Sequence, residues 1–183
     1  MSKYAIGAVF VNNQGCKYTI TAKAKKQGYW HVRFDSGFTT IAKQQNILYG
    51  KVKDYMHPSV YGVGYLGAAV HIPGRAPNNL LRRKYDLWAN MLKRVYGGYN
   101  DKWSADYSDV EVTPEWLCFA TFAVELEDVP NYEAWVSDSR MCLDKDLAGK
   151  RLYSKGTCTF LTPTESLSEL SLRRWDKVKM ATD

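Results

Sequence analysis

The chain has 183 residues, of which 45% are hydrophobic and 14% aromatic, with six prolines and a formal net charge of +6. This composition excludes a disordered chain, and the length suffices for one large domain or two small ones with buried cores. No apolar run is long enough to cross a membrane and no N-terminal signal peptide is recognisable, so we expect a cytoplasmic protein without a membrane partner. The four cysteines are scattered and form no Cys-x-x-Cys pair, which predicts reduced thiols packed as small hydrophobic side chains.

The positive charge is concentrated at the N-terminus. Residues 1–60 contain nine Lys or Arg and two Asp or Glu, whereas residues 61–183 contain sixteen and seventeen. Residues 101–146 alone hold twelve acidic and three basic side chains. A localised basic segment favours a polyanionic partner. The alternative is a solvated lysine-rich surface that keeps the protein soluble.

Residues 1–58 have the pattern of a small, basic β module. "VFV" runs into an Asn-Asn-Gln-Gly turn, "CKYTITA", "YWHVRF" and "FTTIA" follow as strands, and "GKVKD" closes the module. Four or five short strands with tight turns predict an SH3-like barrel. Its basic residues are interleaved with aromatic ones, which suits a nucleic-acid backbone with stacking nearby. The candidate nucleic-acid-binding residues of the module are Lys23, Lys25, Lys26 and Arg33.

Residues 59–79 are rich in Gly and Pro and are predicted to be a linker. Gly62 to Gly67 formally match the dinucleotide-binding pattern G-x-G-x-x-G. That pattern requires a preceding buried strand and a following helix, whereas here a proline-led loop precedes it and two further prolines follow. We therefore reject nucleotide binding and expect the glycines to allow close packing.

Residues 80–163 are predicted to form a mixed helix and hairpin unit. A helix is expected from Leu80 to Tyr96, with Asn78 or Asn79 as its cap and Gly97-Gly98 at its end. Its expected buried face comprises Tyr85, Trp88, Met91, Leu92 and Val95. "TPEWLCFATFAVEL" is predicted to be one further helix, capped by Thr113. Arg82, Arg83 and Lys84 are further candidates for contact with phosphate.

Residues 164–183 are predicted to form a basic C-terminal helix. Ser166 and Glu169 have the spacing of a capping box. Arg173 and Arg174 lie on the expected polar side and complete the set of candidate nucleic-acid contacts. A solvated helix face is the alternative for these arginines.

Three motifs appear in a characteristic order, "KYDLWANMLKRVY", "DVEVTPEWLCFATF" and "LDKDLAGKRLYSKGTCTFLTP". In this order the chain resembles a phage-encoded protein family related to HNH (ββα-metal) homing endonucleases, over roughly residues 80–163. The resemblance implies an α+β fold in which a β-barrel-like module precedes a helix and hairpin unit. It also implies an association with DNA in the cytoplasm of a host cell.

The hairpin of an active HNH site carries an Asp-His pair, in which His activates water and Asp binds a divalent cation. Asp144 matches this Asp, but Lys145 stands in place of His, and a protonated lysine is a poor base. Asp144 and Asp146 would face the same way in a strand and suit Mg²⁺ through water, although salt bridges to neighbouring cations are the favoured alternative. We therefore expect a degenerate site with no catalytic residue and no cofactor, with Mg²⁺ needed only by a divergent nuclease.

These observations are compatible with three functions. The favoured one is a non-catalytic phage DNA-binding protein on a degenerate HNH scaffold, with double-stranded DNA as its partner. The second is a protein-binding inhibitor or adaptor that contacts a host protein through the acidic middle of the chain and exposed aromatic residues. The third is a divergent metal-dependent DNA endonuclease.

Overall fold

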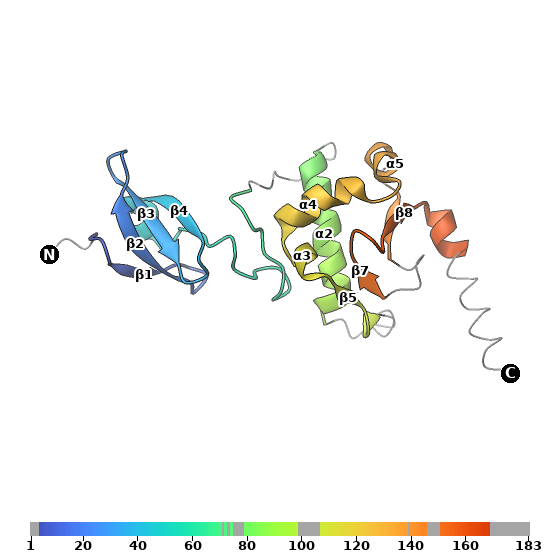
Figure 1. Cartoon of the computed structure of the whole chain (residues 1–183), viewed down its shortest axis with the longest axis horizontal. Coiled ribbons are helices and arrows are strands. Elements are labelled where there is room, and N and C mark those ends of the chain that lie inside the picture. Colours follow the sequence, from blue (N-terminus) through green and yellow to red (C-terminus); the bar gives the residue numbers. More distant parts are fainter. Residues whose placement is uncertain are drawn as a thin grey trace. The chain divides into compact units, whose positions relative to one another are not determined.

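The structure is a computed structural model that describes residues 4–70, 72, 74, 79–98, 107–138, 140–145 and 151–168. The chain forms two compact units, Met1–Ser59 with Tyr65–Ala69, and Val60–Gly64 with Val70–Asp183 (Figure 1). The fold is mixed α+β, with an antiparallel sheet in the first unit followed by helices in the second, which confirms the α+β part of the predicted fold class. Within the predicted linker, residues 60–64 belong to the second unit and residues 65–69 to the first.

The first unit is built on a four-stranded antiparallel sheet in the order β1-β2-β3-β4 (Figure 1). Its elements are β1 (Val9–Val11), β2 (Lys17–Lys23), β3 (Tyr29–Phe34), β4 (Thr39–Lys43) and the short α1 (Gln44–Leu48). Short strands that follow one another in sequence pair with their neighbours, since tight turns join them. Gly15 has a φ of 82°, as the predicted Asn/Gly turn between β1 and β2 requires.

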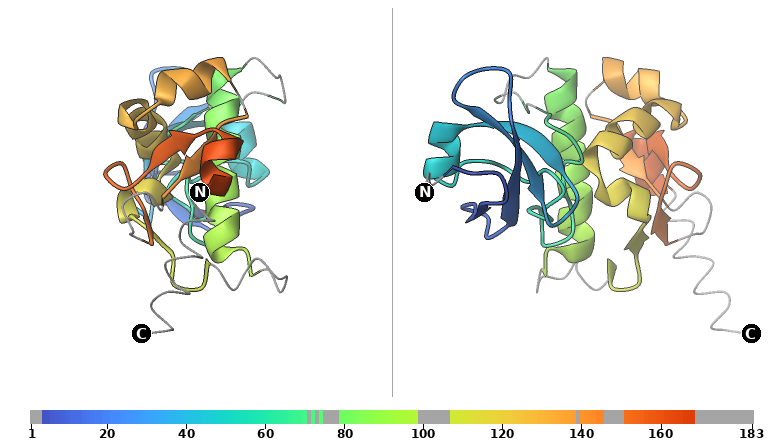
Figure 2. Two further views of the ribbon diagram at one scale, coloured as in Figure 1. Left: turned by 90° about the vertical axis from the view of Figure 1, so that its right-hand side faces the viewer. Right: turned by 60° about the vertical axis from the view of Figure 1, so that its left-hand side comes forward.

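One face of this sheet is the core of the first unit. Alternation along β2 and β3 places Tyr18, Ile20, Val32 and Phe34 on the same side, where all four are buried. Ile47 from α1, shown in cyan in Figure 2, belongs to the same hydrophobic cluster. Trp30 is partly buried against this cluster.

The predicted fifth strand, "GKVKD", is not a strand. Residues 51–54 have irregular backbone. Hydrogen bonds from the β1–β2 turn fix this segment instead of strand pairing. The buried Asn12 amide donates to the Val52 carbonyl at 2.9 Å, and the Asn13 N–H donates to the Gly50 carbonyl at 2.8 Å. The sheet therefore has β1 and β4 as its edges, and no strand of the described residues closes it into the predicted barrel.

The second unit packs helices against two small pairs of strands (Figures 1 and 2). Its elements are α2 (Leu80–Tyr96), β5 (Glu111–Val112), α3 (Pro114–Leu117), α4 (Phe119–Glu125), the 3₁₀ turn η2 (Leu126–Asp128), α5 (Tyr132–Ser137), β6 (Cys142–Asp144), β7 (Leu152–Tyr153) and β8 (Thr159–Leu161). Residues 163–168 are also helical.

Helix α2 has the predicted bounds and cap. The Asn79 side chain accepts a hydrogen bond from the Arg82 N–H at 3.0 Å, which satisfies one of the free donors of the first turn. Of the predicted buried face, Trp88, Met91 and Leu92 are buried, while Tyr85 and Val95 are half-buried. Lys84 is also buried, which the pattern did not predict.

Gly64 packs closely against α2. A Cβ atom at this position would collide with the side chains of Trp88 and Leu92. The glycine pattern of residues 62–67 thus includes a position where glycine allows close approach, as the sequence suggested. Residues 65–70 contain no helix, so the arrangement that a dinucleotide-binding loop needs does not follow it.

The helix predicted for "TPEWLCFATFAVEL" is two helices, because the chain breaks at Cys118. The backbone of Cys118 is extended, with φ −88° and ψ 115°, and separates α3 from α4. Within a continuous helix the Trp116 carbonyl would accept a bond from four residues on. Here it accepts a hydrogen bond from the buried Trp88 indole N–H at 2.7 Å instead. The break therefore provides the partner that a buried indole N–H requires.

The strands in the region of the predicted hairpin do not pair with their immediate neighbours in sequence. β6 pairs antiparallel with β8, whereas β7, which lies between them in sequence, pairs in parallel with β5. Leu143 pairs with Phe160 and both are buried. Phe160 stacks on Trp135 of α5 with ring centroids 5.1 Å apart. The β6–β8 pair is thereby fixed by side chains from elsewhere in the chain.

The helix that follows β8 begins earlier than predicted. Its capping residue is Thr162, whose N–H donates to the Glu165 carboxylate at 2.8 Å while the Glu165 N–H donates to the Thr162 hydroxyl at 3.3 Å. This is a reciprocal capping box. Ser166, predicted to be the cap, lies inside the helix.

Candidate nucleic-acid interface

The face of the first unit's sheet that lies opposite its core is exposed. The pairing register aligns Val9, Thr19, Arg33 and Thr39 in one row across all four strands, and cross-strand partners project on the same side. Arg33 is exposed, Val9 is 62% exposed, and Ile41, two positions along β4, is 55% exposed. We call this surface the outer face. Its register positions are Val9, Val11, Lys17, Thr19, Ala22, Tyr29, His31, Arg33, Thr39, Ile41 and Lys43.

Three cations lie on the outer face, Lys17, Arg33 and Lys43, and its register positions include no acidic residue. All three residues are exposed, and their side chains make no hydrogen bond or ion pair with the part of the chain that the structure describes. Lys17 pairs with Val11 and Lys43 with Tyr29, so the two lysines are six register positions apart, or about 20 Å along the sheet. The outer face is thus an extended positive surface.

The four candidates predicted in this unit do not form one cluster. Arg33 lies at the centre of the outer face. A β-bulge between Ile20 and Ala22 shifts the register so that Lys23, although exposed, pairs with Trp30 and not with an outer-face residue. Lys25 and Lys26 are exposed in the β2–β3 turn, and the Lys26 ammonium lies 4.7 Å from the centroid of the Tyr29 ring.

Lys17 and Lys43 were not among the predicted site residues. Both could have been found from the alternation pattern, because Tyr18 and Ile20 point into the core and Lys17 must then point outward. The bulge at residues 20–22 could not have been found in this way. A bulge is an irregularity of pairing between strands and leaves no simple mark on the hydrophobic pattern.

The predicted phosphate contacts of α2 have structural partners instead. Lys84 is 5% exposed, and its ammonium donates to the Ala123 carbonyl at 2.7 Å and to the Glu127 carboxylate at 2.6 Å. Arg83 donates to two backbone carbonyls at the end of α5, those of Trp135 and Val136, at 2.6 and 2.8 Å. We therefore exclude Lys84 and Arg83 from the interface, since DNA contact would break these bonds.

Arg82 is the third of these residues, and it is half-buried. It forms a bidentate pair with Asp86 one turn along α2, at 2.7 and 2.9 Å. Its positive charge is thereby matched by a neighbouring carboxylate. Arg173, Arg174 and Asp146, also predicted as site residues, lie outside the described residues.

The strand end predicted to match an HNH site places Lys145 in the interior. Lys145 is 5% exposed, with its ammonium 5.1 Å from the ring centroid of Tyr107 and 5.6 Å from that of Tyr153. A cation over two aromatic rings is stabilised by their negative faces. Asp144 is half-buried and accepts a long hydrogen bond from the Ser166 hydroxyl at 3.5 Å. Within the described ranges, no group of three or more His, Cys, Asp or Glu side chains could hold a metal ion.

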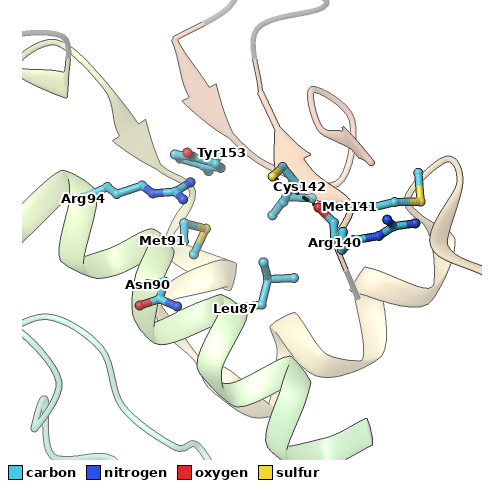
Figure 3. Close-up of a pocket in the computed structure, with 9 residues that line it drawn as sticks. Leu87, Asn90, Met91, Arg94, Arg140, Met141, Cys142 and Tyr153 are labelled. Atoms are coloured by element: carbon cyan, nitrogen blue, oxygen red, sulfur yellow. Dashed lines mark hydrogen bonds between the residues drawn. The ribbon is translucent and has the colours of Figure 1, made fainter. Parts of the chain in front are cut away.

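A pocket of about 180 Å³ lies between α2 and β6 (Figure 3). Arg94 and Tyr153 lie at one end of it and Arg140 at the other. The Arg140 guanidinium donates hydrogen bonds to the Asp138 carboxylate. These bonds lower the pKa of Asp138 to about 2. Burial raises the pKa of the Tyr153 hydroxyl above its ordinary value, so this group stays protonated. The Tyr153 hydroxyl is therefore not a general base of this pocket at neutral pH.

A protein-binding surface would need exposed aromatic side chains, whereas the large aromatic residues named below are buried. Trp88 and Trp116 are fully buried, and Trp135 is 4% exposed. Together with Phe119 and Phe122 they fill the core of the second unit. The described tryptophans of this unit therefore do not supply the exposed aromatic contacts on which the adaptor hypothesis depended.

Comparison with protein-family models, with curated proteins and with solved structures finds no match to this chain. In the described part of the chain, no helix is both long and apolar enough to cross a membrane. A functional assignment accordingly rests on the geometry and charge of the residues described above.

Proposed function

We propose that this protein binds double-stranded DNA, with the outer face of its N-terminal sheet as the contact surface. The observation that carries the proposal is the combination of three exposed cations, Lys17, Arg33 and Lys43, with the absence of acidic residues at the register positions of that face. The two lysines of the β2–β3 turn, Lys25 and Lys26, extend the positive surface at one end of the sheet.

Charge complementarity favours DNA over a neutral partner. Duplex DNA carries one negative charge per about 1.7 Å of its axis, so a positive surface about 20 Å long spans several phosphates. Each phosphate contact releases condensed counterions and makes affinity fall with salt. A solvated surface needs no such segregation, because cations and acids mixed on one face would serve it equally well.

A salt titration tests this proposal. We expect the wild-type protein to bind a duplex of about 20 base pairs, measured by fluorescence anisotropy, with an affinity that falls steeply as salt rises. Replacing Lys17, Arg33 and Lys43 together by Gln should weaken binding and reduce the slope of log K against log[salt] by about 2 to 3, since about 0.9 is lost per contact.

The matched control removes the same charge elsewhere in the unit. Lys23 pairs with Trp30 and not with an outer-face residue, and Lys51 and Lys53 are exposed outside the sheet. Replacing these three by Gln should change the salt slope much less. Equal losses in the two triple variants would mean that net charge alone acts, and an unaltered outer-face variant would refute the interface.

We further propose that the hairpin unit is a degenerate HNH scaffold without nuclease activity, derived from a phage homing-endonuclease relative. The burial of Lys145 over Tyr107 and Tyr153 supports this, because a buried cation satisfied by aromatic rings is suited to packing and not to accepting a proton from water. Supercoiled plasmid incubated with the protein and Mg²⁺ or Mn²⁺ should stay intact. Nicking that disappears in Asp144→Ala would establish the divergent nuclease instead.

A further inference from the structure

Arg33 occupies a distinctive place on the outer face. In its row across the sheet, its neighbours on β2 and β4 are Thr19 and Thr39, whose side chains are short. The arginine side chain is much longer than either, so it can extend beyond its neighbours on this face. β3 is hydrogen-bonded to a strand on each side, which fixes the backbone from which Arg33 projects.

The guanidinium of Arg33 is available for a ligand. It has no hydrogen bond or ion pair with any described residue, and the paired strand positions of its face include no acidic residue. A guanidinium presents five N–H donors in a planar fork, which matches two adjacent acceptors better than a single charge does. In the major groove, guanine offers such a pair in its O6 and N7 atoms.

The strands that carry Arg33 have the dimensions of a groove-binding element. β2 and β3 form a two-stranded antiparallel ribbon, and the major groove, about 12 Å wide, admits such a ribbon. Lys17 lies at one end of this ribbon, and Lys25 and Lys26 lie in the turn at the other. These two ends are about 20 Å apart at 3.3 Å per residue. The lysines can therefore contact phosphates at two separate points along the groove while Arg33 lies over base edges.

We propose that Arg33 reads a guanine in the major groove through paired hydrogen bonds to O6 and N7, with the β2–β3 ribbon lying in the groove. This inference rests on the DNA-binding function proposed above and adds sequence preference to it. Phosphate contacts alone position a protein without carrying sequence information, so a preference requires a base-reading group of this kind.

The test begins by selecting preferred duplexes from a random library with the full-length protein. In the preferred duplex, each guanine is then replaced singly by 7-deazaguanine, which lacks the N7 acceptor. We expect one replacement to weaken wild-type binding by about 5- to 100-fold. The same replacement should have no further effect on Arg33→Gln, because the reader of N7 is then absent. Lys17→Gln is the charge control, and it should bind all duplexes more weakly while keeping the preference.

The outcomes separate this inference from the function on which it rests. If the wild-type protein binds no duplex, the proposed function itself is refuted. Equal affinity of the wild type for all duplexes would leave DNA binding intact and overturn base reading. A 7-deazaguanine effect equally large in Arg33→Gln would show that another residue reads the base, and would overturn the role of Arg33.

Discussion

Replacing Lys84 by Met tests the conclusion that this lysine serves the fold and not a nucleic-acid surface. The ammonium of Lys84 donates to the Ala123 carbonyl and the Glu127 carboxylate, and it lies 5.1 Å from the centroid of the Tyr132 ring. Met retains most of the apolar stem but removes every donor. The variant therefore isolates the contribution of the charged group at nearly constant packing.

The expected loss of stability follows from the interactions that each partner of Lys84 loses. The Ala123 carbonyl loses a hydrogen bond from a charged donor, worth about 1.5–3 kcal/mol, and the cation–π contact is lost as well. Part of this is offset because a buried Met, unlike an ammonium, needs no desolvation. Glu127 is 59% exposed and returns to water at little cost. We expect Lys84→Met to lower the free energy of unfolding by about 2 kcal/mol.

Urea unfolding at neutral pH, followed by tryptophan fluorescence, measures this change because Trp88, Trp116 and Trp135 are buried in the same unit. A loss of about 2 kcal/mol should shift the midpoint by about 1 M. Glu127→Gln is the matched control, and it should cost less than about 1 kcal/mol because its amide oxygen still accepts a bond and the site is exposed. The reasoning would be refuted by a Lys84→Met midpoint equal to that of the wild type, or by a Glu127→Gln cost as large as that of Lys84→Met.

Two further predictions concern packing and the thiols. Gly64→Ala should destabilise the second unit by about 1–3 kcal/mol through its collision with Trp88, whereas Gly74→Ala, which meets open space, should leave the urea midpoint unchanged. Burial raises the pKa of the Cys158 thiol from its ordinary 9.0 to about 12, so the fold favours the neutral thiol; its contribution to stability is complete below about pH 9 and is lost as pH rises towards 12. At pH 8 a thiol-specific reagent should therefore modify the exposed Cys142 quickly and Cys158 only after unfolding, and rapid modification of Cys158 in the folded protein would contradict its burial.

Local patterns were sufficient where the interactions themselves are local. The alternation of "KYTITA" and "YWHVRF" predicted β2 and β3, because a strand turns successive residues to opposite faces. The bounds of α2 followed from the Asn78-Asn79 pair and from Gly97-Gly98, since capping involves residues within one turn. These elements were correct because their causes lie within a few residues.

Predictions that depended on distant partners were less successful. The helix broken at Cys118 has a strong helical pattern on both sides, and the hydrogen bond from Trp88 to the carbonyl freed by the break comes from another helix. Strand pairing is similar, because β7 contacts β5 and not its neighbours in sequence. Nothing in a short window of residues specifies such partners.

The same division applies to the candidate site. The concentration of positive charge in the first sixty residues could be predicted, since net charge is a property of composition. Which cations can contact a ligand depends on how the elements pack. Lys84 and Arg33 are equally basic in the sequence, but one is covered by a neighbouring helix and the other projects from an open sheet. Exposure depends on what packs against a residue, and the packing partners of Lys84, Ala123 and Glu127, lie about forty residues away along the chain.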